Sequence, residues 1–275
     1  MSTSWTRVTR KKPCPICEKP DWCSISADGQ VVVCMRAESS KPCKSGGWFH
    51  NLAEPVQYRP EPRKKPVPVQ DFTNLVCEYE RNLQDVEMAA QGLGVSARSL
   101  ERLQTGWNGC GLTFPMRDGH ERIIGIRIRA SSHKWCVPGS HNALFWPEGV
   151  YSGSDYRLFI CEGPTDCAAL LSLGFGAIGR PSCQGGTDHM IEFLKGRRRE
   201  VIVMADRDPA KKRPDGSVFR PGQEGAARLA QAIRPFVRTC KIIRPPFCKD
   251  ARAWLQAGAT REVVEAVIKG TRYAP

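Results

Sequence analysis

Short apolar runs alternate with amphipathic stretches from Leu158 onward. The runs LFIC, GAI, VIVMA and KII have the length of buried strands, and each is followed by a segment with helical periodicity. Those segments are residues 166–173, 187–194, 223–233 and 251–256. Strands that alternate with helices form a parallel sheet with helices on both faces. The pattern therefore predicts an α/β fold for this part of the chain.

The region before it has a different pattern. Residues 71–104 have helical periodicity, and Ser96 is a plausible N-cap for a short helix that carries Leu100 and Leu103. Residues 111–146 resemble strands. In IIGIRIR, the isoleucines Ile124, Ile126 and Ile128 alternate with Gly125, Arg127 and Arg129. This alternation predicts a strand with one apolar face and one cationic face, and hence an α+β segment.

The first 52 residues are rich in cysteine and turn residues. They are followed by PVQYRPEPRKKPVPV, with five prolines and four basic residues, which cannot pack a core and favours extended geometry. We therefore predict a small β module at 1–52, a semi-rigid linker at 53–70, a basic α+β segment at 71–154 and the parallel-sheet domain at 155–275.

The chain of 275 residues has a formal net charge of +13 and a pI near 9.3, which favours a polyanionic partner such as nucleic acid. A membrane surface and an inert basic surface are the competing interpretations. No apolar run reaches the length of a transmembrane helix, and no signal peptide is recognisable at Met1. We therefore expect a cytoplasmic protein without a membrane partner.

Five of the 13 cysteines lie between Cys14 and Cys43. In a chain without a secretory signal, this clustering indicates a metal site. Cys14 and Cys17, in CPIC, form a knuckle whose two thiolates reach one Zn²⁺. A hairpin that turns at Asp28-Gly29 would place Cys23 directly opposite Cys34, on the same face. These four cysteines are the predicted ligands; the alternatives to Cys23 are His50 and, more weakly, Cys43.

Carboxylates follow two of the predicted parallel strands. Glu162 comes directly after LFIC, and Asp206 and Asp208 come after VIVMA. Ligands bind at the carboxyl ends of strands in such sheets, so the three acids should meet there and bind Mg²⁺ or Mn²⁺. Asp166 and Asp250 are further candidates, each with a helix cap or a surface charge as its alternative role.

The acids at this edge resemble the Toprim domain of DnaG-type primases, topoisomerases, OLD-family nucleases and RecR-type recombination proteins. Glu162 matches that family's Glu-Gly turn, and Asp206 and Asp208 match its Asp-x-Asp. The cysteine-rich module resembles the zinc ribbon of DnaG-type and phage primases, although its second knuckle is not Cys-x-x-Cys. The resemblance implies a zinc ribbon followed by a basic subdomain and a Rossmann-like Toprim domain.

The order of these parts resembles a DNA primase, which makes short RNA primers on single-stranded DNA from nucleoside triphosphates. By the same resemblance, Arg127, Arg129 and Lys134 would contact template and nucleotide phosphates; otherwise they form a solvated strand face. The compact chain suggests a phage or mobile element that uses a separate helicase. A RecR-like DNA-binding mediator and a Toprim nuclease are the alternatives. The basic insertion at 209–221 is either a solvated loop or a contact to nucleic acid.

Overall fold

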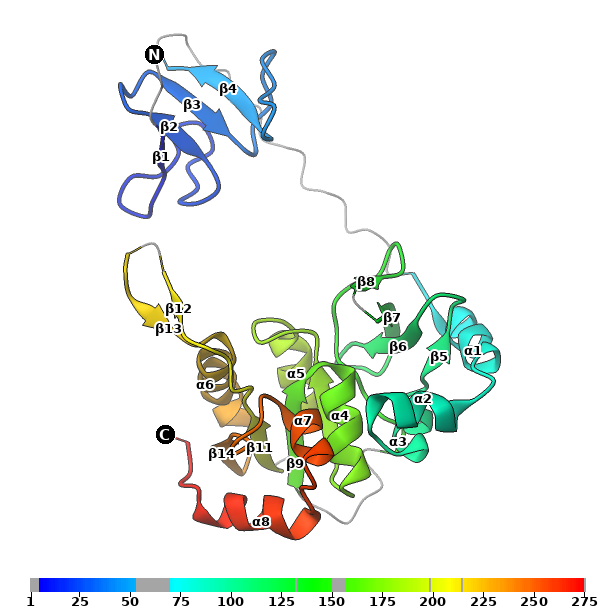
Figure 1. Cartoon of the computed structure of the whole chain (residues 1–275). Helices are drawn as coiled ribbons and strands as arrows, with labels where there is room; N and C mark the ends of the chain where they lie inside the picture. The colour runs from blue at the N-terminus through cyan, green and yellow to red at the C-terminus, as the bar shows by residue number, and fades with distance from the viewer. Residues whose placement is uncertain are drawn as a thin grey trace. The chain divides into compact units, whose positions relative to one another are not determined.

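The computed structural model describes residues 5–52, 70–131, 133–149, 157–197, 199–213 and 215–274. The chain divides into two compact units, Met1–Pro68 and Val69–Pro275 (Figure 1). The predicted linker lies outside the described residues except for Gln70, and so does the predicted boundary at 154/155.

The first unit contains one antiparallel sheet, with strand order β1-β2-β3-β4. The predicted hairpin is present, because Ser24 pairs with Val33 and Ile25 pairs with Val32. Gly29 at the turn has φ +74°, a conformation that suits glycine. The strands are β1 (Trp5–Arg7), β2 (Ser24–Ser26), β3 (Val31–Cys34) and β4 (Trp48–Asn51).

The second unit begins with three helices and a four-stranded antiparallel sheet of order β5-β6-β7-β8. Ser96 caps the third helix, since its side chain accepts a hydrogen bond from the Ser99 N–H at 3.3 Å. The elements are α1 (Thr73–Asn82), α2 (Val86–Leu93), α3 (Ala97–Arg102), β5 (Gly106–Trp107), β6 (Leu112–Arg117), β7 (Ile123–Arg129) and β8 (Lys134–Cys136).

The predicted parallel sheet follows, with strand order β10-β9-β11-β14. Its strands are β9 (Arg157–Glu162), β10 (Ala177–Arg180), β11 (Glu200–Met204) and β14 (Thr239–Ile243). The helices are α4 (Gly163–Ser172), α5 (Thr187–Leu194), α6 (Pro221–Ile233), α7 (Ala251–Gln256) and α8 (Arg261–Gly270), with a 3₁₀ turn at Arg234–Phe236.

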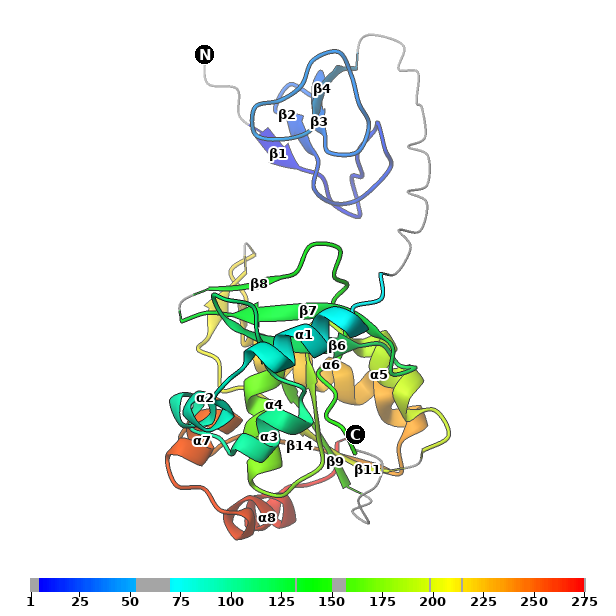
Figure 2. The ribbon, with the colours of Figure 1, turned by 90° about the vertical axis from the view of Figure 1, so that its right-hand side faces the viewer.

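Helices cover both faces of this sheet (Figures 1 and 2). Successive side chains of a strand point to opposite faces. Accordingly, Phe159 and Cys161 of β9 belong to one buried cluster with α4, α7 and α8, whereas Leu158 and Ile160 belong to a second cluster with α5 and α6. The α/β prediction is confirmed, and the sheet is buried on both sides.

The predicted alternation along β7 holds only in part. Arg117 pairs with Ile123 and Met116 pairs with Gly125, so Ile124 is an extra residue in the strand. A bulge of this kind interrupts the regular alternation. As a result, Ile124 belongs to the same buried cluster as Met116, whereas Ile126 belongs to the cluster that includes α1.

The two four-stranded sheets of the second unit are connected through residues 144 and 145. The Leu144 and Arg117 backbones exchange hydrogen bonds of 2.7 and 2.9 Å, and the Phe145 and Gly179 backbones exchange bonds of 2.8 and 2.9 Å. One extended segment therefore pairs with the antiparallel sheet at one residue and with β10 at the next.

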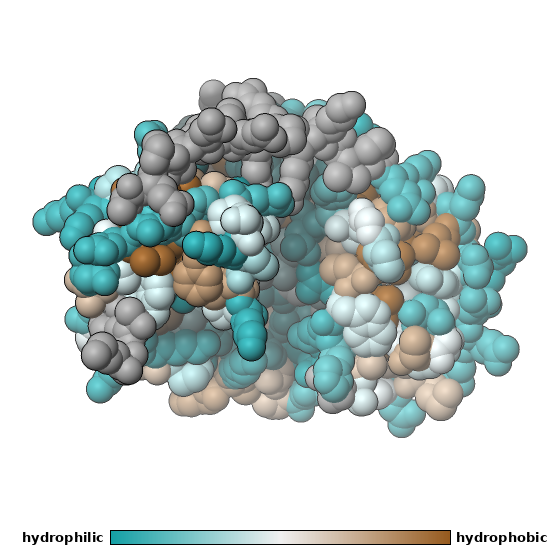
Figure 3. Space-filling model, turned by 90° about the horizontal axis from the view of Figure 1, so that it is seen from above, coloured by the Kyte–Doolittle hydropathy of each residue, from teal (hydrophilic) through white to brown (hydrophobic). Residues whose placement is uncertain are grey.

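No helix among the described residues is long and apolar enough to cross a membrane. The face in Figure 3 is mostly hydrophilic, with hydrophobic side chains in small separated areas. Scattered apolar side chains of this kind are normal on a protein surface.

Candidate active site and zinc centre

The structure brings the four predicted cysteines together. The ligand atoms of Cys14, Cys17, Cys23 and Cys34 all lie within 4.8 Å of one another, and all four residues are buried and free of disulfides. The Cys23 sulfur lies 3.7 Å from that of Cys17 and 3.9 Å from that of Cys34. Four sulfurs at about 2.3 Å from one Zn²⁺ lie about 3.8 Å apart in a tetrahedron. The cluster therefore fits a structural zinc ion.

The two alternative ligands lie outside this cluster. His50 is buried in β4, and its Nε2 lies 3.0 Å from the Ala37 carbonyl oxygen, within hydrogen-bond distance. The Cys43 sulfur contacts the Ser45 hydroxyl at 3.1 Å. The hairpin register thus brings Cys23 to the fourth position, as the pairing across Asp28-Gly29 predicted.

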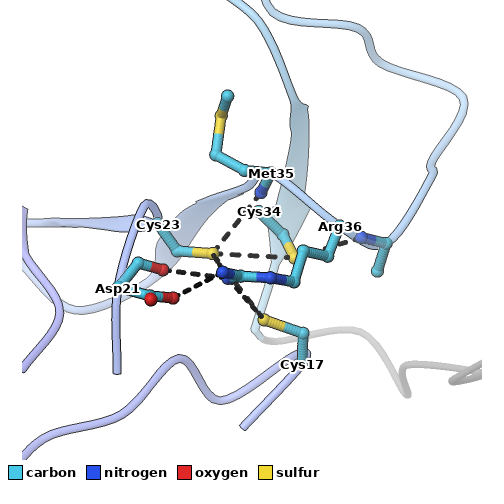
Figure 4. Close-up of polar contacts among 7 residues, drawn as sticks. Cys17, Asp21, Cys23, Cys34, Met35 and Arg36 are labelled. Atoms are coloured by element: carbon cyan, nitrogen blue, oxygen red, sulfur yellow. Dashed lines mark hydrogen bonds and ion pairs between the residues drawn. The ribbon is translucent and has the colours of Figure 1, made fainter. Parts of the chain in front are cut away.

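Arg36 places positive charge beside the sulfurs (Figure 4). Its guanidinium group lies 3.9 Å from the sulfurs of both Cys17 and Cys23, and Asp21 holds it through a 2.5 Å ion pair. Burial raises the pKa of Cys23 and of Cys34, so their thiolate forms need a nearby cation. Arg36 partly offsets the negative charge of a four-thiolate site. This role of Arg36 was not predicted from the sequence.

Backbone N–H groups also point at the sulfurs. The Met35 N–H donates to the Cys23 sulfur at 3.4 Å, and the Ala37 N–H donates to the Cys34 sulfur at 3.3 Å. Hydrogen bonds to the charged form of a group favour that form. The loop after β3 therefore supports thiolates although its sequence, MRA, lacks the second knuckle.

The three predicted metal-binding acids lie at the carboxyl edge of the parallel sheet. Glu162 ends β9, and Asp206 and Asp208 follow the neighbouring strand β11. From β9 the chain runs to β10 on one side, and from β11 it runs to β14 on the other. The ends of β9 and β11 thus flank the topological switch point of the sheet, where open α/β sheets bind ligands.

These acids disfavour one another's charge. Burial, with the carboxylates of Asp166 and Glu162 as the next causes, raises the pKa of Asp206 to about 8. Burial also raises the pKa of Glu162, and Asp208 adds to this against the opposite effect of Arg180. A cation at this edge would relieve the repulsion.

The loop after β11 is held against the start of α6. The Asp208 carboxylate accepts a 2.9 Å hydrogen bond from the Gly222 N–H at the start of α6. A Cβ on Gly222 would lie 2.9 Å from the Asp206 carbonyl oxygen, so only glycine allows this close approach. Arg207, between the two acids, instead donates to the Pro245 carbonyl at 3.1 and 3.2 Å.

The two further acids have defined structural partners. Asp250 is the N-cap of α7 and accepts the Ala253 N–H at 2.8 Å, which is the cap role that the sequence left open. Asp166 is buried in α4 and accepts the Arg252 N–H at 3.0 Å. Burial and the nearby Asp250 carboxylate raise the pKa of Asp166 to about 7. Both acids therefore contribute negative charge next to Asp206.

The acids fit a hard divalent cation by donor chemistry, because carboxylate oxygens are the ligands that Mg²⁺ and Mn²⁺ prefer. Within the described ranges, only the four cysteines have ligand atoms all within 4.8 Å of one another. No three carboxylates of the described residues form a group of this kind. Part of the coordination would then come from substrate phosphates and water, as is usual for Mg²⁺.

The cationic face of β7 points toward the core that both sheets share. Arg127 pairs with Phe114 and Arg129 pairs with Leu112, and cross-strand partners project from the same face. Phe114 and Leu112 pack into the cluster that contains Phe159 of β9.

Arg129 and Lys134 lie within electrostatic reach of the acids. Burial lowers the pKa of Arg129, and the charges of Arg252, Asp166 and Asp250 also act on it. Burial and the neighbouring Arg129 lower the pKa of Lys134. Arg127 donates to the Asn142 side chain at 2.8 Å, and its buried Nε has no hydrogen-bond partner among the described residues. Arg129 and Lys134 thus lie near Asp166, and Arg127, Arg129 and Lys134 are together called the cationic wall below.

A cavity of about 880 Å³ opens beside this wall. Its lining includes apolar and aromatic residues from α2, β5 and β6, with Trp107 and Met88 among them, and the basic residues Arg129 and Arg252. Two other tryptophans differ in exposure: Trp146 is buried edge-to-face against Phe193, and Trp135 is 39% exposed. Because segments far apart in the sequence line the cavity, no local sequence pattern predicts it.

No family model and no curated protein matches the chain. Solved structures do match. The Escherichia coli primase catalytic core aligns with a TM-score of 0.58 at 19% identity, over 76% of this chain and 81% of that one. The chain has the fold of a primase catalytic core. A DnaG catalytic domain bound to single-stranded DNA gives the same TM-score at 18% identity, over 75% of this chain and 79% of that one.

The primase fold extends to the first unit. The Aquifex aeolicus primase structure, which contains zinc-binding and RNA polymerase domains, aligns over 95% of this chain and 78% of that one. Its TM-score is 0.55 at 11% identity. A small sheet with a four-cysteine cluster, an antiparallel segment and a Toprim-like parallel sheet therefore occur here in the order that the sequence predicted.

Proposed function

We propose that the protein is a DNA primase that synthesises short RNA primers on single-stranded DNA from nucleoside triphosphates. The observation that carries this proposal is the arrangement at the edge of the parallel sheet. The charge of Asp166 acts there both on Asp206 and on the cationic side chains of Arg129 and Lys134. A site with these two walls suits a polyanionic substrate held between divalent cations and basic side chains. A related fold solved with single-stranded DNA supports the same substrate class.

The reaction would be nucleotidyl transfer. The oxygen of a 3′-hydroxyl forms a bond to the α-phosphorus of the incoming nucleotide, while the bond to the pyrophosphate oxygen breaks and the hydroxyl proton is released. Glu162, Asp206 and Asp208 would hold Mg²⁺ or Mn²⁺, which supplies charge neutralisation and activates the hydroxyl. Arg129 and Lys134 would neutralise and position the phosphates, which is most of what a protein contributes to phosphoryl chemistry.

The first unit, called the zinc module below, would select the template. Its fold depends on the four cysteines, because they make up half of the buried residues of its small core. A module of this kind, tethered by the predicted linker at 53–70, is held at high effective concentration near the catalytic unit. We propose that it binds single-stranded template during initiation, when no primer is yet paired.

One assay tests the proposal against its two rivals. The protein is incubated with single-stranded DNA, labelled ribonucleotides and Mg²⁺ or Mn²⁺. We expect a ladder of short RNA products. Cut DNA without RNA would identify a Toprim nuclease, and DNA binding with neither product would identify a RecR-like mediator. A separate helicase partner and a phage or mobile-element origin stay predictions.

The cationic wall gives a prediction of its own. Replacing Arg127, Arg129 and Lys134 with glutamine should lower the slope of log K against log salt for single-stranded DNA by about 2, since each phosphate contact contributes about 0.7. Fluorescence anisotropy across a salt series measures this slope. A control triple substitution at Arg98, Lys269 and Arg272, which are exposed elsewhere on the same unit, should leave the slope unchanged. An unchanged slope and unchanged nucleotide affinity in the first variant would assign these residues to a solvated face.

A further inference from the structure

The basic insertion after the Asp-x-Asp acids folds into a ribbon. Strands β12 (Lys211–Lys212) and β13 (Val218–Phe219) are antiparallel, with Lys211 opposite Phe219 and Lys212 opposite Val218. Between the strands, the Asp215 carboxylate accepts the Ser217 N–H at 2.9 Å. The insertion therefore contains two paired β-strands and is not an irregular loop throughout.

The two ends of the ribbon are fastened at the catalytic edge. It begins after Asp208 and ends before Gly222, and these two residues are joined by a 2.9 Å hydrogen bond. Arg213 adds a second attachment, because it forms a 2.5 Å ion pair with Glu224 of α6 and stacks on the Phe219 ring at 4.5 Å. The face of the ribbon that carries Arg213 and Phe219 is therefore attached to α6.

The opposite face is free and cationic. Cross-strand partners share a face, and residues two apart in an extended strand do too. Lys212, Val218 and the extended Arg220 therefore lie together, on the face away from Arg213 and Phe219. All three are exposed, Val218 to 57%. In the part of the chain that the structure describes, neither Lys212 nor Arg220 forms an ion pair with an acidic side chain.

We propose that this face, defined by Lys212, Val218 and Arg220, binds the sugar-phosphate backbone of a nucleic-acid strand that passes the catalytic edge. Figure 1 shows the ribbon on the α6 side of the parallel sheet and β7–β8 on the other side, with β9 and β11 between them. Two cations and one apolar side chain on a β-ribbon can contact a sugar-phosphate backbone without reading the base sequence. The polyanion is assigned as nucleic acid because the ribbon begins at Asp208, so the inference rests on the proposed function.

The test is the salt dependence of binding in the full-length protein, without nucleotides or divalent ions. Two probes are used, a labelled single-stranded 20-mer and the same strand in a duplex. For the variant Lys212→Ser/Arg220→Ser we expect the log-log slope to fall by about 1.4 on the single strand or by about 1.8 on the duplex. On the single strand, this means that the variant loses about sevenfold less affinity than the wild type between about 50 and 200 mM salt.

A matched control and a gain-of-charge variant complete the experiment. Lys269→Ser/Arg272→Ser removes the same charges near and just after the end of α8, which lies at the other end of the parallel sheet from the ribbon (Figure 1), and should leave the slope unchanged. Val218→Lys adds a cation to the proposed face at an exposed position and should raise the slope by about 0.7 on the single strand.

The outcomes separate the ribbon from the proposed function. If the wild type binds DNA and neither ribbon variant changes the slope on either probe, the ribbon is a solvated element and the inference is wrong, while the primase proposal stands. A change on one probe identifies which form of nucleic acid the ribbon contacts. If the wild type binds neither probe, both proposals fail together.

Discussion

Asp206→Asn is expected to abolish nucleotide incorporation while DNA binding survives. The substitution keeps the shape of the side chain but removes a charge from the carboxylates that would hold the catalytic cations. Metal stabilisation of transition-state charge contributes several kcal/mol, so the rate should fall about a thousandfold or more. Primer synthesis on single-stranded DNA, measured beside anisotropy with the same DNA, checks both parts. Glu162→Gln should behave in the same way.

Misfolding can be distinguished from lost chemistry in this experiment. The pKa of Asp206 is raised by burial and by neighbouring carboxylates, so its charge is unfavourable in the folded protein without metal. The substitution Asp206→Asn removes that repulsion, and the metal-free variant should melt no lower than the wild type. Asp188→Asn, which changes an exposed acid of α5, is the matched control and should retain activity. Near-normal primer synthesis by the Asp206 variant would contradict the mechanism.

The second large effect concerns the zinc module. Replacing Cys14 or Cys17 with serine should remove about one zinc per chain and unfold the first unit, because binding of a structural zinc contributes about 10 kcal/mol or more to the folding of such modules. De novo initiation should then be lost, whereas extension of a supplied oligoribonucleotide should continue. A fragment that starts near Asp71 should show the same division.

The chain supplies matched controls for this prediction. Cys43→Ser removes a cysteine outside the cluster and should keep the zinc. Cys23→Ala should lose it, and His50→Ala should keep it, since His50 contacts the Ala37 carbonyl instead. Metal analysis of the purified variants gives the result directly. If the truncated fragment initiates with undiminished site preference, the module does not select the template.

Local rules account for what the sequence predicted well. The partner of Cys23 follows from a two-residue turn, since pairing outward from Asp28-Gly29 fixes every later pair. The convergence of Glu162 and Asp206 follows from the rule that parallel strands end at one edge. Both predictions need only the spacing of residues in the sequence and the general geometry of β-strands.

Features that depend on contacts between distant segments could not be predicted from the sequence. Arg36 reaches the sulfurs through a loop whose path depends on the pairing of β3 with β4. The bulge at Ile124 arises from a mismatch with β6 that no single strand reveals. The ribbon of β12 and β13 is only two residues long on each side, too short for a periodic signal, and its stability comes from contacts with α6.

The extended segment at Leu144 and Phe145 has a consequence for the energetics of folding. It pairs with the antiparallel sheet and with β10, and side chains from both sheets pack into one buried cluster. Neither half can lose its structure without exposing the apolar surface and backbone groups of the other. The fragment from Gln70 to the end of the chain should therefore unfold in a single cooperative transition, with equal calorimetric and van 't Hoff enthalpies. The cationic wall and the acid edge should therefore be lost together in that transition.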